Sequence, residues 1–405
     1  MFAADRSCTE VLSKFLAWLA LERGQTASPS TGGYCRARAR LPLRELEQLR
    51  FRIAERIESM ATEQRHWCAR AVKVVDGSSL SMPDTPQNQR AYPQPKGQQP
   101  GCGFPVMRIV AIFSLTSGVM LAVAKGALSL GERTLWRSLW GLFEPGDVVL
   151  ADRGFCSYAE LYFMLRRSID CVMRNHQRRK VGLELVRKLG KGDRLVKWHK
   201  TTACPKWLDE QRWLALPGTL VVREITLTVD IPGFRTKTII VVTTLLDPKQ
   251  FPTDAFAQLY RRRWMAELFL RDIKTTMGMD VLRCKSPEMI HKELSMYVIA
   301  YNLIRALNLQ AAQNHHVSPF RISFKGTIAT VRQWAPLMAA ANLDEKALQQ
   351  ITTTMLHYLA RKLIPDRPNR AEPRARKRRP KQYQLLNKPR RIFKEIQHRN
   401  HYRKA

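Results

Sequence analysis

The sequence predicts a mixed α/β fold, in which helices cover a β-sheet, and two observations support that prediction. Short β-rich runs alternate with helical patterns between residues 72 and 173, in the order strand, hairpin, helix, strand, helix, strand. A later stretch, residues 176–245, is rich in Thr and Val and is typical of antiparallel strands joined by a Pro-Gly turn. The length of 405 residues suggests roughly two to four structural units.

The charge of the chain indicates a polyanionic partner. It carries 68 Lys and Arg against 34 Asp and Glu, a formal net charge of +34. Phosphate neutralisation is the usual role of such an excess, so nucleic acid is the favoured partner. Ribosomal and membrane-surface proteins are also this basic, and charge alone leaves those classes open. The eight cysteines form no C-x-x-C pair, which argues against a zinc ribbon or a disulfide scaffold and favours reduced thiols in the cytosol.

A membrane location is not expected. The N-terminus lacks a basic start followed by an apolar segment, so no signal peptide is predicted. The most apolar stretch, residues 109–124, is short for a span and has Thr-Ser-Gly in its middle. Two apolar strands joined by a tight glycine turn explain it better. We therefore expect a cytoplasmic, nucleoid-associated protein.

The remaining elements follow from local signals. Residues 72–75 form a short strand that ends on Asp76, and residues 147–150 form another that ends on Asp152. Helices are predicted at 131–143 and 158–166, with a strand at 169–173. Further helices should begin at Asp254, at Ser286 followed by a proline, and at Asp344. The last forty residues are rich in Pro and Arg, and we expect a tail that orders only on DNA.

Residues 259–277 form a predicted helix with one chemically distinct face. Tyr260, Arg263, Glu267 and Lys274 fall within roughly 60° of one another at 100° per residue, and Arg271 joins them. A carboxylate flanked by cations suits a metal-binding acid beside a phosphate backbone. The simpler interpretation is a solvated charged face with i,i+4 ion pairs, and this helix alone favours it.

The two aspartates add a second observation. Carboxylates that follow neighbouring strands can converge, and an acid from a helix could complete a site for two Mg²⁺ ions. Such a site would hold the attacking and leaving oxygens of an in-line phosphoryl displacement. An aspartate at the end of a strand is more often a turn residue, so neither Asp76 nor Asp152 carries the interpretation by itself.

Three segments together resemble a known family. The spacing Y-x2-R-x3-E-x6-K, formed by Tyr260, Arg263, Glu267 and Lys274, matches the Y-R-E-K signature of the bacterial insertion-sequence transposases of the IS-four family. VVDGSSLSMPDTPQNQRAYP resembles the first-aspartate region of that family and VVLADRGF the second. The resemblance covers the chain from about residue 70 onward. It departs at Ser78, where the family more commonly has threonine.

The resemblance implies an RNase H-like fold with Asp76, Asp152 and Glu267 as the catalytic, metal-binding triad. It also implies two Mg²⁺ ions per site, with Mn²⁺ as a substitute, and DNA contacts near the cleaved end. The residues expected to make those contacts are Tyr260, Arg263 and Lys274, with Arg271 and Arg153 as further candidates.

The implied reaction is cut-and-paste transposition. A nick at the element end releases a 3′-OH, which attacks the opposite strand to form a hairpin, and after reopening joins target DNA. The partners would be double-stranded DNA with terminal inverted repeats, target DNA and a second copy of the chain.

The chain is expected to divide into several regions. These are 1–70, a helical DNA-binding region whose truncation is left open; 71–175 and 246–310, the catalytic core; 176–245, the β-strand insertion; 311–363, a helical region; and 364–405, the basic tail.

Three other functions remain as alternatives: a DNA-binding protein without activity, an RNase H-like nuclease that only hydrolyses DNA, and a basic RNA-binding assembly factor.

Several other residues are expected to have structural or surface roles only. Trp264 is expected in the core in preference to stacking on a flipped base. Asp84 is expected to be a turn acid, and surface positions are expected for Glu160, Glu293, His315 and His316.

Overall fold

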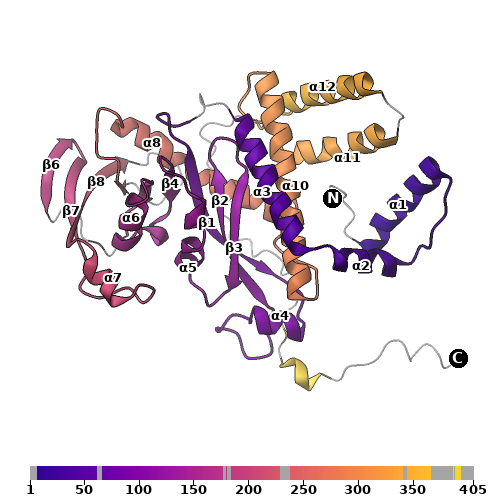
Figure 1. Cartoon of the computed structure of the whole chain (residues 1–405), viewed down its shortest axis with the longest axis horizontal. Helices are drawn as coiled ribbons and strands as arrows, with labels where there is room; N and C mark the ends of the chain where they lie inside the picture. The colour runs from indigo at the N-terminus through magenta and orange to yellow at the C-terminus, as the bar shows by residue number, and fades with distance from the viewer. Residues whose placement is uncertain are drawn as a thin grey trace.

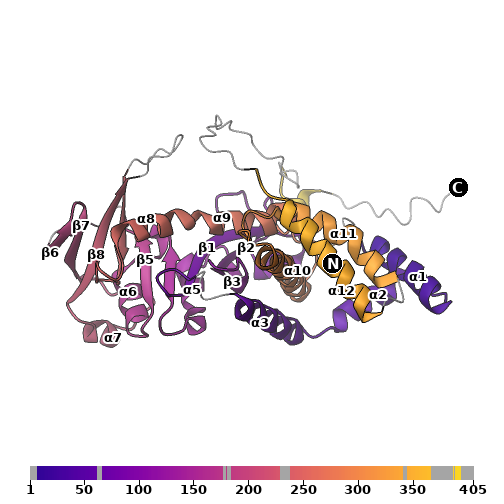
Figure 2. The same cartoon turned by 90° about the horizontal axis from the view of Figure 1, so that it is seen from above.

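The computed structural model describes residues 7–61, 66–176, 179, 184–228, 238–340, 344–365, 386 and 388–393. Within these residues the chain forms a mixed α/β structure around one sheet, in the order β3-β2-β1-β4-β5-β9-β8-β7-β6 (Figures 1 and 2). The strands are β1 (Val72–Ser81), β2 (Val106–Ser114), β3 (Met120–Ala127), β4 (Val148–Ala151), β5 (Asp170–Arg174), β6 (Leu185–Gly190), β7 (Asp193–His199), β8 (Thr219–Thr228) and β9 (Thr238–Thr243).

The first five strands have the RNase H-like arrangement. β1, β2 and β3 are antiparallel neighbours, while β4 runs parallel to β1 and β5 parallel to β4. The hairpin expected within residues 109–124 is present as β2 and β3. Gly118 turns between them with a φ of 76°, and an added Cβ would lie 3.0 Å from a ring carbon of Phe320. Both the backbone and the packing therefore require glycine at this turn.

The predicted first strand was too short. β1 continues to Ser81 because β2 pairs with it along its whole length, including Asp76 opposite Ala111. The Gly-Ser-Ser sequence that suggests a turn is held extended by these tertiary hydrogen bonds. Asp76 therefore lies inside a strand, two residues after Val74, the last residue of β1 that pairs with β4.

The residues expected to form a β insertion supply four antiparallel strands, β6 to β9, and a short helix, α7 (Glu210–Ala215). β9 pairs with β5, so these strands extend the sheet formed by β1 to β5. The predicted Pro-Gly turn, at positions 232–233, lies outside the described residues.

Helices cover both faces of the sheet, as Figure 2 shows. On one face pack α8 (Thr253–Arg262), α9 (Trp264–Arg271), α10 (Pro287–Asn314) and α11 (Phe324–Ala340). On the other pack α5 (Glu132–Arg137), the 3-10 turn η2 (Trp140–Leu142), α6 (Tyr158–Leu165) and α7. The remaining elements are α1 (Cys8–Arg23), α2 (Thr31–Arg40), α3 (Leu43–Met60), α4 (Pro86–Ala91), η3 (Arg153–Phe155), η4 (Asp272–Thr276), α12 (Glu345–Arg361) and η5 (Arg390–Ile392).

Most predicted helix starts are confirmed. Asp344 accepts a 2.7 Å hydrogen bond from the backbone N–H of Ala347 and so caps α12. Pro287 follows Ser286 at the start of α10. The helix predicted at 131–143 is instead divided into α5 and η2.

No helix in the described ranges is long and apolar enough to cross a membrane. The tail prediction falls mostly on positions outside those ranges.

Candidate active site

Strand periodicity places both predicted aspartates on one face of the sheet. Val74 and Leu80 of β1 are buried in the core beneath α8 and α9, as is Leu150 of β4. Side chains alternate along an extended strand, so Asp76 shares the face of Val74. Asp152 follows Leu150 by two residues, and its backbone remains extended, with φ −79° and ψ 170°. It therefore continues onto the same face.

The helical segment that carries the third acid is not one regular helix. α8 ends at Arg262, α9 begins at Trp264, and residues Asp272–Thr276 form a π-helical turn. A single uninterrupted helix from 259 to 277 was therefore a wrong prediction. π-helical turns are rare and occur frequently at functional sites. Phe269 and Ile273 are buried, as expected for residues opposite the charged face.

Arg263 lies among the three predicted acids. Its Nη2 donates a 2.8 Å hydrogen bond to Oε1 of Glu267. Burial alone would lower the pKa of Arg263, but the bond to Glu267 and the charge of Asp152 raise it above the ordinary value. The charge of Arg263 in turn lowers the pKa of Asp76. One guanidinium thus interacts electrostatically with all three carboxylates, and the i,i+4 ion pair left open by the sequence is present.

Asp76 is held in an environment that disfavours its charge. Burial is the largest influence and raises the pKa of Asp76 to about 6, with further contributions from the charges of Glu267 and Glu132. The N–H of Gly77, which donates a 2.9 Å bond to Oδ1 of Asp76, and the charge of Arg263 only partly oppose this shift. A carboxyl with a raised pKa beside two other acids is typical of a functional site.

The donor set fits a divalent ion in its chemistry, because carboxylate oxygens are the ligands that Mg²⁺ prefers. Its geometry is not that of a closed site. The described part of the chain contains no group of three or more His, Cys, Asp or Glu side chains that could hold a metal ion. In this conformation Arg263 donates a hydrogen bond to one carboxylate oxygen of Glu267, Oε1. A metal ion at Glu267 would therefore have to use the other oxygen, Oε2, or the ion pair would have to open.

Lys274 reaches the strand that carries Asp76. Its Nζ donates a 2.7 Å hydrogen bond to Oγ of Ser78, two residues beyond Asp76 and on the same face of β1. The π-helical turn that contains Lys274 thus directs this side chain toward the acids. The residue at which the sequence departs from the family pattern, Ser78, keeps the hydroxyl that accepts this bond.

The other predicted DNA-contacting residues occupy different environments. Tyr260 is buried, and burial raises the pKa of its phenol; the charges of Arg263 and Asp152 also act on it. Arg153 is partly buried, and its backbone N–H donates a 2.7 Å bond to Oδ1 of Asp152. Arg271 lies at the surface, 3.9 Å from the carboxylate of Asp272. The structure therefore brings Tyr260, Arg263 and Lys274 to the acids more clearly than Arg271.

Trp264 is not in the core. It is 44% exposed, contrary to the expectation of burial. The helical hydrogen bonding is interrupted at Arg263, whose backbone angles remain α-helical, and Trp264 begins α9. An exposed indole is thus present beside the guanidinium that interacts with all three acids.

Glu160 was also misassigned, because it is buried rather than at the surface. Its carboxylate accepts a 2.8 Å bond from Nη1 of Arg137, and burial raises its pKa. The apolar residues around it in α6 were a signal of burial that could have been used. Glu293, likewise partly buried, accepts bonds from the backbone N–H groups of Arg283 and Cys284. His316 is exposed and His315 half-buried.

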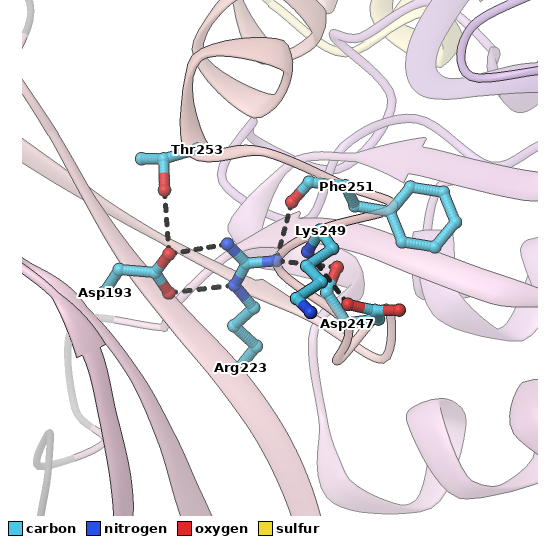
Figure 3. Close-up of polar contacts among 6 residues, drawn as sticks. All are labelled: Asp193, Arg223, Asp247, Lys249, Phe251 and Thr253. Atoms are coloured by element: carbon cyan, nitrogen blue, oxygen red, sulfur yellow. Dashed lines mark hydrogen bonds and ion pairs between the residues drawn. The ribbon is translucent and has the colours of Figure 1, made fainter.

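A buried ion pair that was not predicted connects the insertion to the start of α8 (Figure 3). Arg223 of β8 is fully buried and makes two hydrogen bonds, of 2.8 and 2.5 Å, to the carboxylate of Asp193. Arg223 also donates to the carbonyl of Phe251, and Thr253 donates to Asp193. The insertion thereby fixes the beginning of the helical segment that carries the candidate active site. The sequence does contain a signal for this pair: an arginine inside the apolar strand LVVREITL is expected to be buried and to need an acidic partner.

The chain is similar to known transposases. The family model described as "Transposase DDE domain" matches residues 67–303. "Transposase InsG for insertion sequence element IS4" of Escherichia coli (strain K12) is 29% identical over 328 residues, which cover 80% of this chain and 71% of that protein. A structure of the piggyBac transposase synaptic complex with hairpin DNA shares 7% identity and a TM-score of 0.40, and is too distant to inform the site; the match covers 70% of this chain and 57% of that one.

The family model spans more than half of the chain and includes all three predicted acids. The chain therefore belongs to the transposase DDE domain family and, within it, to the IS-four family of insertion-sequence transposases, enzymes that cleave DNA and transfer its strands.

Proposed function

We propose that the chain catalyses cut-and-paste transposition and that Asp76, Asp152 and Glu267 are its catalytic triad. The observation that supports this most directly is that three acids, from β1, from the position after β4 and from α9, all interact with the charge of Arg263. These acids come from the three segments that resemble the family motifs. A merely structural role would leave unexplained why three partly buried acids of like charge lie around one arginine.

The three carboxylates would hold the divalent ions that the family typically uses. Two Mg²⁺ ions, with Mn²⁺ as a substitute, would activate the attacking oxygen and stabilise the leaving oxygen. Arg263 would release Glu267 and contact a DNA phosphate instead. Lys274, whose ammonium group is hydrogen-bonded to Ser78 on the same sheet face as Asp76, would contact a second phosphate. Its positive charge would neutralise the DNA backbone beside the scissile bond.

The reaction would proceed by successive phosphodiester exchanges. Water attacks the phosphate at the element end and releases a 3′-OH. That hydroxyl attacks the opposite strand, which forms a hairpin and frees the flanking DNA. A second water reopens the hairpin, and the restored 3′-OH attacks a phosphate of the target. Each step forms one P–O bond and breaks one, so the same group of acids could serve all of them.

The proposed partners are double-stranded DNA with terminal inverted repeats, target DNA and a second copy of the chain, since pairing two ends calls for two sites. Tyr260 would contact the cleaved end together with Arg263 and Lys274, and Arg153 and Arg271 are secondary candidates. We place this activity in the bacterial cytoplasm, at the nucleoid.

The test is to replace each acid of the triad by Ala and to measure cleavage and joining of DNA that carries the flanking repeats, with Mg²⁺. We expect each variant to lose both reactions and to retain DNA binding, because a methyl group cannot bind the metal. Asp254→Ala is the matched control, since it removes an exposed acid from α8, outside the triad. Near-wild-type cleavage by any triad variant would remove that residue from the proposal. A wild-type chain that binds but never cleaves would favour a DNA-binding protein without activity.

A further inference from the structure

Two adjoining hollows lie between the catalytic core and the insertion. They measure about 860 and 950 Å³ and share the lining residues Arg133, Gly154, Ser157, Arg179 and Thr201. Their walls come from the start of α5, from the loop after β4 that leads into α6, and from the chain between β7 and α7. We call this continuous feature the insertion groove. It belongs to the sheet face covered by α5 and α6, opposite to α8 and α9 (Figure 2).

The insertion groove is strongly basic. Its first hollow is lined by the cations Arg108, Arg133, Arg137, Arg179 and Lys206, and among the described lining residues Glu132 is the only acid there. The second hollow adds Lys197 and Lys200 and contains no Asp or Glu among its described lining residues. Such an excess of one sign in a concave surface concentrates a positive potential and attracts a polyanion.

Two of the guanidinium groups are held against aromatic rings. Arg137 lies 4.4 Å from the centre of the Trp207 ring, and Arg179 lies 4.1 Å from that of Trp198. Arg137 is also bonded to the buried carboxylate of Glu160. An arginine that is already immobilised loses little conformational entropy when it binds a phosphate, so these contacts favour binding of a sugar-phosphate backbone.

The groove lies next to the candidate active site, although none of the three acids is among its described lining residues. Gly154 follows Asp152 by two residues. At the other wall, the side chain of Glu132 packs over Gly77, where an added Cβ would meet Glu132 Cδ at 2.5 Å. The charge of Glu132 also acts on Asp76. A DNA strand that leaves the acids on this side would therefore enter the groove, on the sheet face that does not carry Glu267.

We propose that the insertion groove binds the phosphate backbone of the DNA that lies beyond the scissile phosphate, outside the element. This proposal rests on the proposed function, because it takes the position of the reacting end from the triad. The same chemistry can come from two sources: the flanking donor DNA before cleavage, and the target DNA at strand transfer. Both present an unbroken backbone on the outer side of the reacting phosphate.

The test is the double variant Arg133→Gln/Arg179→Gln, which removes two shared cations and leaves the bonded pair of Arg137 and Glu160 intact. Lys346→Gln/Arg361→Gln, which removes two exposed charges from α12, is the matched control. Binding is measured, without divalent metal, to duplexes that carry the element end with a long flank or with none. Thermal melts of all proteins establish that each variant folds.

For the donor arm, we expect the groove variant to lose about tenfold in affinity for the flanked duplex, and little for the flankless one. The slope of log K against log salt should fall by about 2, close to 0.9 for each phosphate that the variant no longer neutralises. For the target arm, the variant supplied with pre-cleaved ends should need a higher target concentration for strand transfer. A loss in either arm supports the proposal and identifies the source. No loss in both arms, or a loss equal to that of the control, overturns it.

A native cysteine provides a second measurement. Cys204 lines the first hollow. A flank that carries a disulfide-activated tether on a phosphate should form a mixed disulfide with Cys204, and Cys204→Ser should abolish it. Cross-linking only at other cysteines would contradict the placement. Because neither binding nor cross-linking needs cleavage, a failure of the proposed function would appear separately, as triad variants that cleave or a wild-type protein that does not.

Discussion

Nη2 of Arg263 lies 2.8 Å from Oε1 of Glu267, so the arginine proposed to contact DNA pairs with the acid proposed to hold metal. In this arrangement the guanidinium competes with a metal ion for Oε1 of Glu267 and with a DNA phosphate for its own N–H groups. DNA and metal would instead separate the pair, the phosphate taking the guanidinium and the ion taking the carboxylate. Binding of DNA and binding of metal should therefore favour each other.

The first prediction is that Arg263→Ala binds divalent metal more tightly in the absence of DNA, while it cleaves DNA more slowly. Loss of a partly exposed ion pair should strengthen Mn²⁺ binding by about two- to fivefold, in line with the modest value of such pairs. Titration calorimetry or Mn²⁺ resonance spectroscopy would measure it. Arg261→Ala, on the exposed side of α8, is the control for charge. Unchanged or weaker binding by Arg263→Ala would show that the pair does not restrain Glu267.

The second prediction concerns Asp76 and pH. Its pKa of about 6 in the folded protein, set mainly by burial, lies above the ordinary value of 3.8. The folded state therefore binds more protons than the unfolded state between these values, and stability falls as the pH rises through that window. Asp76→Asn should increase the free energy of unfolding above pH 6, by up to about 3 kcal/mol. The gain should vanish as the pH falls to about 4.

Metal-free denaturation at several pH values would measure this effect, with Asp254→Asn as the control. Mg²⁺ should narrow the difference, because only the carboxylate can bind it. A lower stability of Asp76→Asn at pH 8 would show that the charged carboxylate is stabilised rather than strained.

The third prediction separates Lys274 from the hydroxyl it contacts. Lys274→Ala should slow cleavage and weaken the complex with the element end by about tenfold or more, as expected for a lost bond to a charged group. Ser78→Ala should have a much smaller effect, since the ammonium group would remain. Metal binding should survive in both variants. If the serine variant were as defective as the lysine variant, the bond between them would be structural.

The fourth prediction concerns the buried pair in Figure 3. Arg223→Met should cost about 3–5 kcal/mol of stability, because it leaves the carboxylate of Asp193 buried without its cation. The double variant Asp193→Asn/Arg223→Met should be more stable than Arg223→Met alone, because it removes the uncompensated charge. Urea unfolding of the two variants would measure this. An equal or larger loss in the double variant would mean that the pair is not the source of the cost.

The local signals in the sequence predicted the parts of the fold that local interactions determine. The turn at Gly118 and the cap at Asp344 each depend on one residue type at one position, and both are confirmed. The full length of β1 was not predictable in this way, because the strand is extended by pairing with β2. The burial of Glu160 likewise depends on Arg137, which lies in a different helix.

The candidate site shows the same division. The spacing of Arg263 and Glu267 predicted that they could meet, and they do. The exposure of Trp264 was missed because helical periodicity does not show which flank of the charged face other elements cover. The tertiary bond from Lys274 to Ser78 was not visible either, since the two residues are 196 positions apart.

The pairing of β5 with β9 means that the insertion cannot be removed as a separate module. Val172, Met173 and Arg174 of β5 lie opposite Thr243, Val242 and Val241. Deletion of residues 176–245 would leave these backbone groups as an open edge, a template on which other chains can assemble. A shortened transposase of this kind would have to cover the edge of β5 by other means.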